Sequence, residues 1–409
     1  MFIADFHIHS KYSRATSKDM DIDHISKWAH LKGIQLIGTG DFTYPDWLRE
    51  LKTKLVKSEY GIYTYNNIYY ILTVEVSNIY FKMGKTRRVH NIIFAPSFED
   101  VDEINKMLTP YGKLFADGRP ILSLPCDEMV KRLRAINPDI FVVPAHAWTP
   151  HFSVFGANSG FDSIEDCFEK ETEHIYSLET GLSSDPPMNW RWSKLDRFCL
   201  MSNSDAHSPA KLGREANVFN KKFGYKELID ILKTKDKEKF LFTIEFYPEE
   251  GKYHWDGHRK CKARLSPKEA KDLNYNCPKC GKKVTIGVMH RIDKLGDREE
   301  GFVLEKSPSF KSLVPLAEII SNALSVGAES IKVKREYNTL LTNLGSEFKI
   351  LLEIPEDTLK KECPVRIAQG ILNTRNRNVE IIPGYDGEYG KVNVFKEGEQ
   401  KAEKQLELF

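Results

Sequence analysis

The sequence has few cysteines, no long apolar run and almost no net charge. Its seven cysteines are too sparse for a disulfide framework, and three of them lie within twenty positions of one another, which is typical of a metal site in a reduced compartment. No apolar run approaches the roughly 20 residues of a membrane-spanning helix. The opening MFIADFHIHS lacks the basic and apolar regions of a secretory signal. We therefore expect a cytoplasmic protein with no membrane partner.

The small net charge conceals an uneven distribution along the chain. In total, 60 Lys and Arg residues face 58 Asp and Glu residues. Residues 252–294 contain 12 Lys and Arg against 4 Asp and Glu, whereas each flank has an acidic excess of three charges. A short basic segment of this kind is typical of a surface that binds polyanions, so the near-neutral total does not exclude a nucleic-acid partner.

Short β-rich runs alternate with amphipathic helical segments along residues 1–245. This alternation predicts an α/β domain with a largely parallel sheet, of the kind that closes into a barrel. Within it, residues 69–81 and 89–96 are expected to be strands of a hairpin pair. The pattern changes at Pro248 and becomes mainly helical from about Leu313. We expect four parts: a barrel domain at 1–248, a basic metal module at 249–295, a mainly helical DNA-binding domain at 296–395 and a flexible tail at 396–409.

Histidine and acidic residues gather where the predicted strands end. Asp5, His7 and His9 alternate along one strand, so their side chains share a face, and Asp205 and His207 do the same after another strand. Four further candidates belong to other predicted strands. Asp41 and His146 each end a strand, Glu75 lies within one, and His90 begins one. Strand ends in a parallel barrel converge on one pocket, and imidazoles with carboxylates are ligands of Zn, Mn or Fe ions. The pattern predicts a multi-metal site.

Three segments resemble motifs of the polymerase and histidinol phosphatase superfamily, which consists of metal-dependent phosphoesterases on a distorted β/α barrel. They are DFHIHS at 5–10, PAHA at 144–147 and SNSDAH at 202–207. The resemblance implies two or three catalytic Zn²⁺, Mn²⁺ or Mg²⁺ ions, with His7 and His9 as catalytic ligands and Asp205 as a ligand or as the group that orients the attacking water. The complete implied ligand set is His7, His9, Asp41, Glu75, His90, His146, Asp205 and His207.

One motif departs from the superfamily pattern, because Asp41 is followed by Phe42 where the superfamily usually has histidine. Either the ligand set is smaller by one imidazole, or Tyr44 or Asp46 compensates for the missing ligand.

The basic segment contains His258-x2-Cys261 and, sixteen positions later, Cys277-x2-Cys280. Two such pairs can hold one structural Zn²⁺ in a closed tetrahedral site; the alternatives are a redox pair, or His254 in place of His258. Exposed cations beside them would contact a phosphate backbone, unless they only solubilise the module. The expected DNA-binding residues are Arg259, Lys260, Lys262, Arg264, Lys282 and Lys283.

The succession of the barrel motifs, IEFYPEEGKYHWDGHRKC, CPKC, GVMHR and a helical end resembles the endonuclease Q family over nearly the whole chain. The resemblance implies cleavage of DNA on the 5′ side of deaminated bases (uracil, hypoxanthine, xanthine) and at abasic sites, with the base flipped out of the stack. Two alternatives are a small-molecule phosphomonoesterase of the histidinol-phosphatase kind and a non-catalytic DNA- or clamp-binding scaffold, which Phe42 favours.

The last five residues, Gln405-Leu406-Glu407-Leu408-Phe409, resemble the bacterial sliding-clamp-binding motif Gln-Leu-Ser/Asp-Leu-Phe. Gln405, Leu406, Leu408 and Phe409 on a charged tether suit a hydrophobic groove, since such anchors need no supporting fold. The motif predicts a sliding clamp as partner and a bacterial member of the family. The alternative is a last turn that packs on its own domain.

Overall fold

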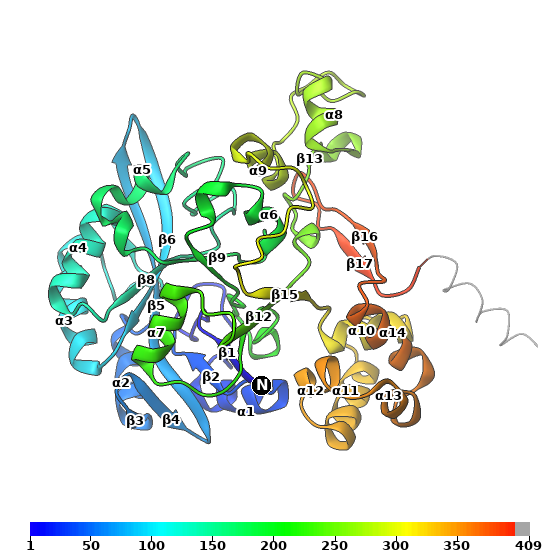
Figure 1. Ribbon diagram of the computed structural model, residues 1–409, viewed down its shortest axis with the longest axis horizontal. Coiled ribbons are helices and arrows are strands. Elements are labelled where there is room, and N and C mark those ends of the chain that lie inside the picture. The colour runs from blue at the N-terminus through cyan, green and yellow to red at the C-terminus, as the bar shows by residue number, and fades with distance from the viewer. Residues whose placement is uncertain (397–409) are drawn as a thin grey trace, which may run out of the picture.

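The computed structural model describes residues 1–396, and its centre is an eleven-stranded sheet that curls into a distorted barrel (Figure 1). The predicted α/β barrel is therefore confirmed. Its strands are β1 (Phe2–Asp5), β2 (Leu36–Gly38), β3 (Val56–Glu59), β4 (Ile62–Tyr65), β5 (Ile68–Lys82), β6 (Lys85–Ala95), β7 (Ile121–Leu122), β8 (Phe141–Pro144), β11 (Ala216–Phe219), β12 (Phe240–Glu245) and β15 (Ser309–Ser312).

The sheet is mixed, so the expectation of a largely parallel sheet is wrong. The pairs β1–β2 and β2–β5 are parallel, but β5–β6, β6–β8, β1–β11 and β11–β12 are antiparallel. Met83 and Gly84 alone connect β5 to β6, and both have positive φ, 52° and 77°. Two such residues form a tight hairpin turn, whereas a parallel pair needs a crossover of a dozen residues or more. The predicted strand pair is thus a long antiparallel hairpin.

The barrel closes where the end of β1 meets the segment after β10. A parallel pair of short strands, β9 (Ser177–Glu179) and β10 (Cys199–Met201), stands beside the main sheet. Beyond it, Ile8 and Ala206 form an isolated bridge, and the backbone N–H of His9 donates to the Ala206 carbonyl at 3.0 Å. This closure brings two of the predicted motifs side by side.

Seven helices cover the barrel in the described chain (Figure 1). The first helix is capped at its start by Asp21, whose side chain accepts the His24 N–H, and at its end by Gly33 with φ 85°. Its buried face consists of Ile22, Ile25 and Ala29. The helices are α1 (Ile22–Lys32), α2 (Pro45–Lys54), α3 (Phe98–Leu108), α4 (Cys126–Ile136), α5 (Ile164–Phe168), α6 (Pro186–Trp190) and α7 (Tyr225–Thr234).

The rest of the described chain forms a small module and a helical bundle on one side of the barrel (Figure 1). The module has β13 (Asp256–His258), β14 (Ala263–Leu265), α8 (Pro267–Asp272) and α9 (Val288–Leu295). The bundle has α10 (Leu316–Leu324), α11 (Ile331–Leu344), α12 (Glu347–Leu352), α13 (Glu356–Glu362) and α14 (Val365–Arg375). The hairpin of β16 (Glu380–Ile382) and β17 (Lys391–Asn393) returns to the module, where the Trp255 N–H donates to the Gly384 carbonyl at 2.9 Å.

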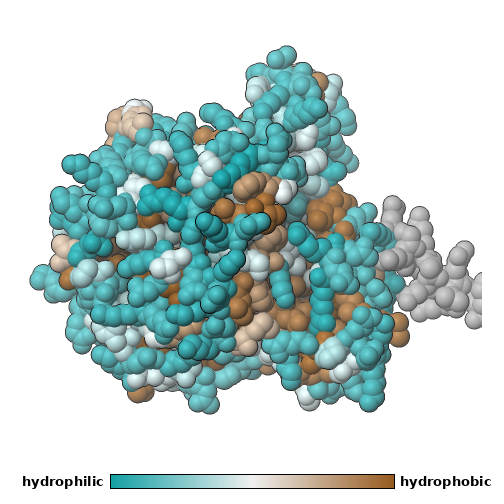
Figure 2. Space-filling model, viewed as in Figure 1, coloured by the Kyte–Doolittle hydropathy of each residue, from teal (hydrophilic) through white to brown (hydrophobic). Residues whose placement is uncertain are grey.

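A buried ion pair joins the barrel to the bundle. Lys32 on α1 lies 2.7 Å from the Glu347 carboxylate on α12, which also accepts the Tyr337 hydroxyl at 2.6 Å and the Leu316 N–H at 3.1 Å. Since every oxygen of this carboxylate is partnered, the pair fixes how the two parts meet. Figure 2 shows a mostly hydrophilic face, with hydrophobic residues gathered near this junction. Within residues 1–396, no helix combines the length and apolar character needed to cross a bilayer.

Candidate metal centres

Four side chains from three parts of the barrel converge on one point. The ligand atoms of His7, His9, Glu75 and Asp205 all lie within 4.8 Å of one another. His9 Nε2 lies 3.2 Å from Glu75 Oε2 and 3.1 Å from Asp205 Oδ1, and His7 Nε2 lies 3.5 Å and 3.6 Å from the same two atoms. This arrangement is the first barrel group.

Carboxylates behind the two histidines set their orientation. His7 Nδ1 lies 3.0 Å from Glu179 Oε1, and His9 Nδ1 lies 3.1 Å from Asp41 Oδ1. When each Nδ1–H donates to its carboxylate, each Nε2 lone pair faces the group, as in metal-binding histidines. Both Nε2 atoms and Asp205 Oδ1 are buried without a hydrogen-bond partner. Buried polar atoms of native proteins normally have hydrogen-bond partners, so these three unpartnered lone-pair atoms suit the ligation of a divalent cation.

A second barrel group shares Glu75 with the first. His90 Nδ1 lies 2.6 Å from Glu75 Oε1, and His146 Nε2 lies 2.9 Å from the same oxygen. These two nitrogen atoms are 3.3 Å apart. His146 has φ 29°, and Thr149 Oγ1 lies 2.9 Å from its Nδ1. The Glu75 carboxylate therefore directs one oxygen toward each group, so it could serve as a ligand in both.

Burial and opposite charges together determine the ionisation of this site. Burial opposes ionisation of Glu75, but His90, His7 and Arg119 hold its pKa well below the usual value. Burial lowers the pKa of His7 and His9, yet the carboxylates beside them, Glu179 for His7 and Asp41 for His9 above all, raise both well above normal. Burial lowers the pKa of His90 to about 4. Glu75 is thus ionised at neutral pH, as a carboxylate that binds a metal must be.

Two of the sequence-predicted ligands, Asp41 and His207, lie outside both groups in the described chain. Asp41 orients His9 and accepts hydrogen bonds from the Ser10 N–H at 2.7 Å and the Ser13 hydroxyl at 2.8 Å. The His207 ring lies 4.5 Å from the His9 ring, but its Nδ1 contacts the Asp205 carbonyl at 2.9 Å. In this geometry Asp41 supports a ligand, and His207 stands at the rim.

The residues that follow Asp41 do not replace the missing imidazole. Phe42 is completely buried in the hydrophobic core, Tyr44 stacks on Tyr12, and Asp46 pairs with Arg49 on the surface. None of them joins a potential ligand group within residues 1–396. Of the two readings of this motif, the geometry favours a ligand set that is smaller by one imidazole. His90 also lies in the middle of β6, so its predicted place at the start of a strand is wrong.

Sequence reasoning missed two residues that contact the ligand groups, Glu179 and Arg119. Glu179 ends β9 and also accepts the His146 backbone N–H at 2.7 Å, so it supports one ligand in each group. Its position at the end of a buried strand was a usable signal. Arg119 contacts Glu75 Oε2 at 3.1 Å, and no motif marked it.

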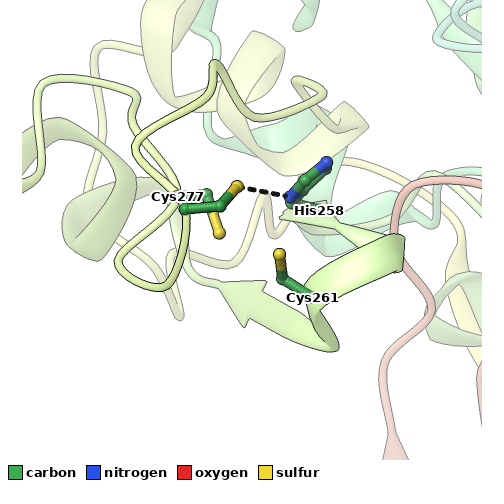
Figure 3. Close-up of side chains that lie close together, drawn as sticks. His258, Cys261 and Cys277 are labelled. Atoms are coloured by element: carbon green, nitrogen blue, oxygen red, sulfur yellow. Dashed lines mark hydrogen bonds between the residues drawn. The ribbon is translucent and has the colours of Figure 1, made fainter.

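His258, Cys261, Cys277 and Cys280 form a third group, in the basic module. Figure 3 shows the side chains of His258, Cys261 and Cys277 directed toward one another. Cys280 Sγ lies 3.3 Å from His258 Nδ1. Burial opposes ionisation of Cys277, but the N–H groups of Lys279 and Cys280 lower its pKa to about 6. One imidazole and three thiols, one readily ionised, suit a tetrahedral Zn²⁺. His254 is buried elsewhere and does not belong to this group.

The six predicted DNA-binding cations are exposed on the module, but one cation of the basic segment is not. Arg291 on α9 is buried and donates to the Phe155 carbonyl at 2.9 Å, the Phe161 carbonyl at 2.7 Å and Asp162 at 2.6 Å. It anchors the loop that follows His146. The exposed cations are Arg259, Lys260, Lys262, Arg264, Lys282 and Lys283.

Parts of the chain match a known family model and a known protein. A family model described as the MJ0043 C-terminal domain matches residues 315–378. The protein MJ0043 of Methanocaldococcus jannaschii is 33% identical over 253 residues, which are 61% of this chain and 31% of that protein, so the chain spans about a third of this relative's length.

Two solved structures match nearly the whole chain. The lesion-specific endonuclease PfuEndoQ from Pyrococcus furiosus is 33% identical, with a TM-score of 0.87, over 100% of this chain and 99% of its own. An Endonuclease Q in complex with a 27-mer duplex substrate that carries an abasic lesion at the active site is 34% identical, with a TM-score of 0.86, over 98% of both chains.

The barrel and its paired ligand groups define a metal-dependent phosphodiesterase. Within that class, the chain belongs to the endonuclease Q family. The sequence resemblance to this family is thus confirmed.

We predict that His7→Ala and Asp205→Ala each lower phosphodiester turnover by more than about a thousandfold, since each removes a ligand from a site that supplies several kcal/mol of transition-state stabilisation. Turnover of a labelled DNA duplex measures the loss, and circular dichroism checks that the fold is retained. The matched control is Asp46→Ala, which removes an exposed carboxylate close to the site in sequence and leaves turnover unchanged. Full activity in both His7→Ala and Asp205→Ala would refute the site assignment.

Proposed function

We propose that this protein is a DNA repair endonuclease that cleaves the phosphodiester bond on the 5′ side of deaminated bases, and that it also acts at abasic sites. The observation that supports it most is the pair of ligand groups joined by Glu75, in a chain whose full-length relatives include a lesion-specific endonuclease. Phosphodiester cleavage needs an activated water and neutralised phosphoryl oxygens, and paired divalent ions supply both.

The protein's own residues would hold and orient the reactants. His7, His9, Glu75 and Asp205 would hold one ion, and Glu75, His90 and His146 the other. Asp205 has φ 46° and its side chain is 27% exposed, so it is the carboxylate of the first group that reaches the open side of the site. We assign it the orientation of the attacking water.

A cavity of about 590 Å³ beside the metal centre is the proposed place for the examined base. Its wall includes Thr149, which contacts His146, and Arg214, which donates to the Asp205 carbonyl at 3.3 Å. Tyr253 of the basic module and Tyr389 of the C-terminal hairpin complete it with aromatic surface. An extruded base stacks on such side chains within reach of the metal ligands.

The remaining parts would hold the duplex and bring the enzyme to replicating DNA. A structural Zn²⁺ at His258, Cys261, Cys277 and Cys280 would stiffen the module of residues 249–295, and its exposed cations, with the helical domain of 296–395, would contact the DNA backbone. The clamp-binding motif, residues 405–409, lies outside the described residues, and we propose a sliding clamp as its partner.

A set of duplexes that differ at one position tests the proposed reaction. Duplexes with one uracil, one hypoxanthine, one abasic site or no lesion are incubated with the protein and Mg²⁺, Mn²⁺ or Zn²⁺, with p-nitrophenyl phosphate as a monoester substrate. We expect a nick 5′ to each lesion and none in the undamaged duplex. The free energy needed to unpair and unstack a base is smallest at a mismatched or damaged position. The Asp205→Ala protein controls for contaminating nucleases.

Two other results would contradict this reaction. Phosphate release from the monoester alone would identify a small-molecule phosphatase, and lesion binding without a nick in any metal would identify a non-catalytic scaffold.

Removal of residues 405–409 tests the clamp partner. We expect the truncated protein to lose binding to a bacterial sliding clamp in a pull-down while it still nicks short duplexes, since the motif is proposed to bind the clamp and none of its residues belongs to the proposed metal centres. Glu407→Ala is the matched control, because it changes the tail without removing an anchor. Unchanged clamp binding by the truncated protein would disprove the claim.

A further inference from the structure

One guanidinium reaches the barrel metal centre. Within residues 1–396, Arg119 is the only Lys or Arg whose side chain pairs with a ligand side chain of either barrel group. Arg119 Nη1 lies 3.1 Å from Glu75 Oε2, the same oxygen that lies 3.2 Å from His9 Nε2 and 3.5 Å from His7 Nε2. A positive side chain therefore stands beside the atoms that would hold the first metal ion.

The loop before β7 fixes the direction of Arg119. The Asp117 carboxylate accepts the Arg119 backbone N–H at 3.1 Å and the Arg14 backbone N–H at 3.3 Å. Gly118 lies so close to Asp41 that an added Cβ would overlap the Asp41 carboxylate. Because Asp41 also orients His9, the loop and the metal ligands share one support. Arg119 is thus held at the centre by the fold and not only by its ion pair.

The guanidinium is well placed to serve a second anion. Its side chain is 27% exposed, whereas Glu75 is completely buried. One of its five donors contacts Glu75, and the others make no hydrogen bond within the described residues. Burial opposes the positive charge, but Glu75 and Asp205 keep the pKa of Arg119 above its usual value. A guanidinium is planar and permanently charged, and its parallel N–H groups can donate to two oxygens of one phosphate at once.

We propose that Arg119 is a further catalytic residue, which binds a non-bridging oxygen of the scissile phosphate and stabilises the charge that develops there. The inference rests on the proposed function for the identity of the substrate as a DNA phosphodiester. During hydrolysis a bond forms between the water oxygen and phosphorus, and the bond from phosphorus to the leaving sugar oxygen breaks. The water gives up a proton, the leaving oxygen gains one, and negative charge grows on the non-bridging oxygens within reach of the guanidinium.

A purely structural role for Arg119 makes the opposite prediction about metal binding. If the arginine only held Glu75 in place, its removal would loosen the ligand group and release metal. If it serves the phosphate, its removal takes a positive charge away from the cation site, so metal binding stays the same or becomes tighter. Metal content therefore separates the two roles independently of activity.

We expect Arg119→Met to lower kcat on the lesion duplex about a hundred- to a thousandfold, the usual effect of losing one preorganised donor. KM should change little, because many other contacts hold the DNA. Metal content, measured by plasma mass spectrometry, should equal that of the wild-type protein, and calorimetry should show weaker binding of inorganic phosphate to the metal-loaded protein. Arg119→Lys should recover part of kcat, because lysine keeps the positive charge but cannot donate two parallel hydrogen bonds to one phosphate. Arg49→Met removes a surface arginine and is the matched control.

Three results would overturn the inference: an unchanged kcat in Arg119→Met, a fall in kcat accompanied by loss of metal, or unchanged phosphate binding. Bis(p-nitrophenyl) phosphate separates this test from that of the proposed function. If the wild-type protein cleaves this small diester but no lesion duplex, the proposed function fails, and Arg119 is then judged by kcat on the small diester. If the wild-type protein cleaves neither, the phosphate-binding measurement alone decides.

Discussion

The buried carboxylate of Glu75 is the constraint on which the rest of the structure depends. It lies within the long strand β5, completely shielded from water, with imidazoles against both of its oxygens. An ionised carboxylate in such a place is costly unless charges and hydrogen bonds surround it. The barrel meets this requirement by bringing β1, β6 and the end of β8 to the same point, so that His7, His9, His90 and His146 enclose Glu75.

Contacts outside the two ligand groups hold the ligands and the neighbouring parts of the protein in place. Glu179 and Asp41 orient the histidines, and Arg291 of the basic module holds the loop that follows His146. The Lys32–Glu347 pair fixes the helical bundle against the barrel. Residues of the barrel, the module and the bundle line one cavity, and its wall includes Thr149, which contacts His146.

Much of the site could be predicted from sequence because strand geometry alternates side chains. His7 and His9 flank the bridged residue Ile8 just after β1 and share a face, whereas Asp5 accepts the Ser204 and Gly213 N–H groups and joins no ligand group in the described chain. The His258 and Cys277 pairs had the spacing of a metal knuckle. Sequence could not separate a metal ligand from its support: Asp41 has the residue type of a ligand but contacts His9. Arg119 escaped notice because arginine is not a ligand type and its approach depends on the packing of Gly118 against Asp41. The β5–β6 hairpin could be predicted, but the antiparallel pairs β1–β11 and β11–β12 could not, because they join segments far apart in the sequence.

The number of metal ions bound by Glu75→Gln tests the central claim most directly. The wild-type protein should bind three ions per chain by mass spectrometry, two in the barrel and one in the basic module. Glu75→Gln should lose both barrel ions together and keep the third, since one carboxylate serves both groups, whereas Cys277→Ser should lose only the module's ion. A Glu75→Gln protein that keeps either barrel ion would contradict the account.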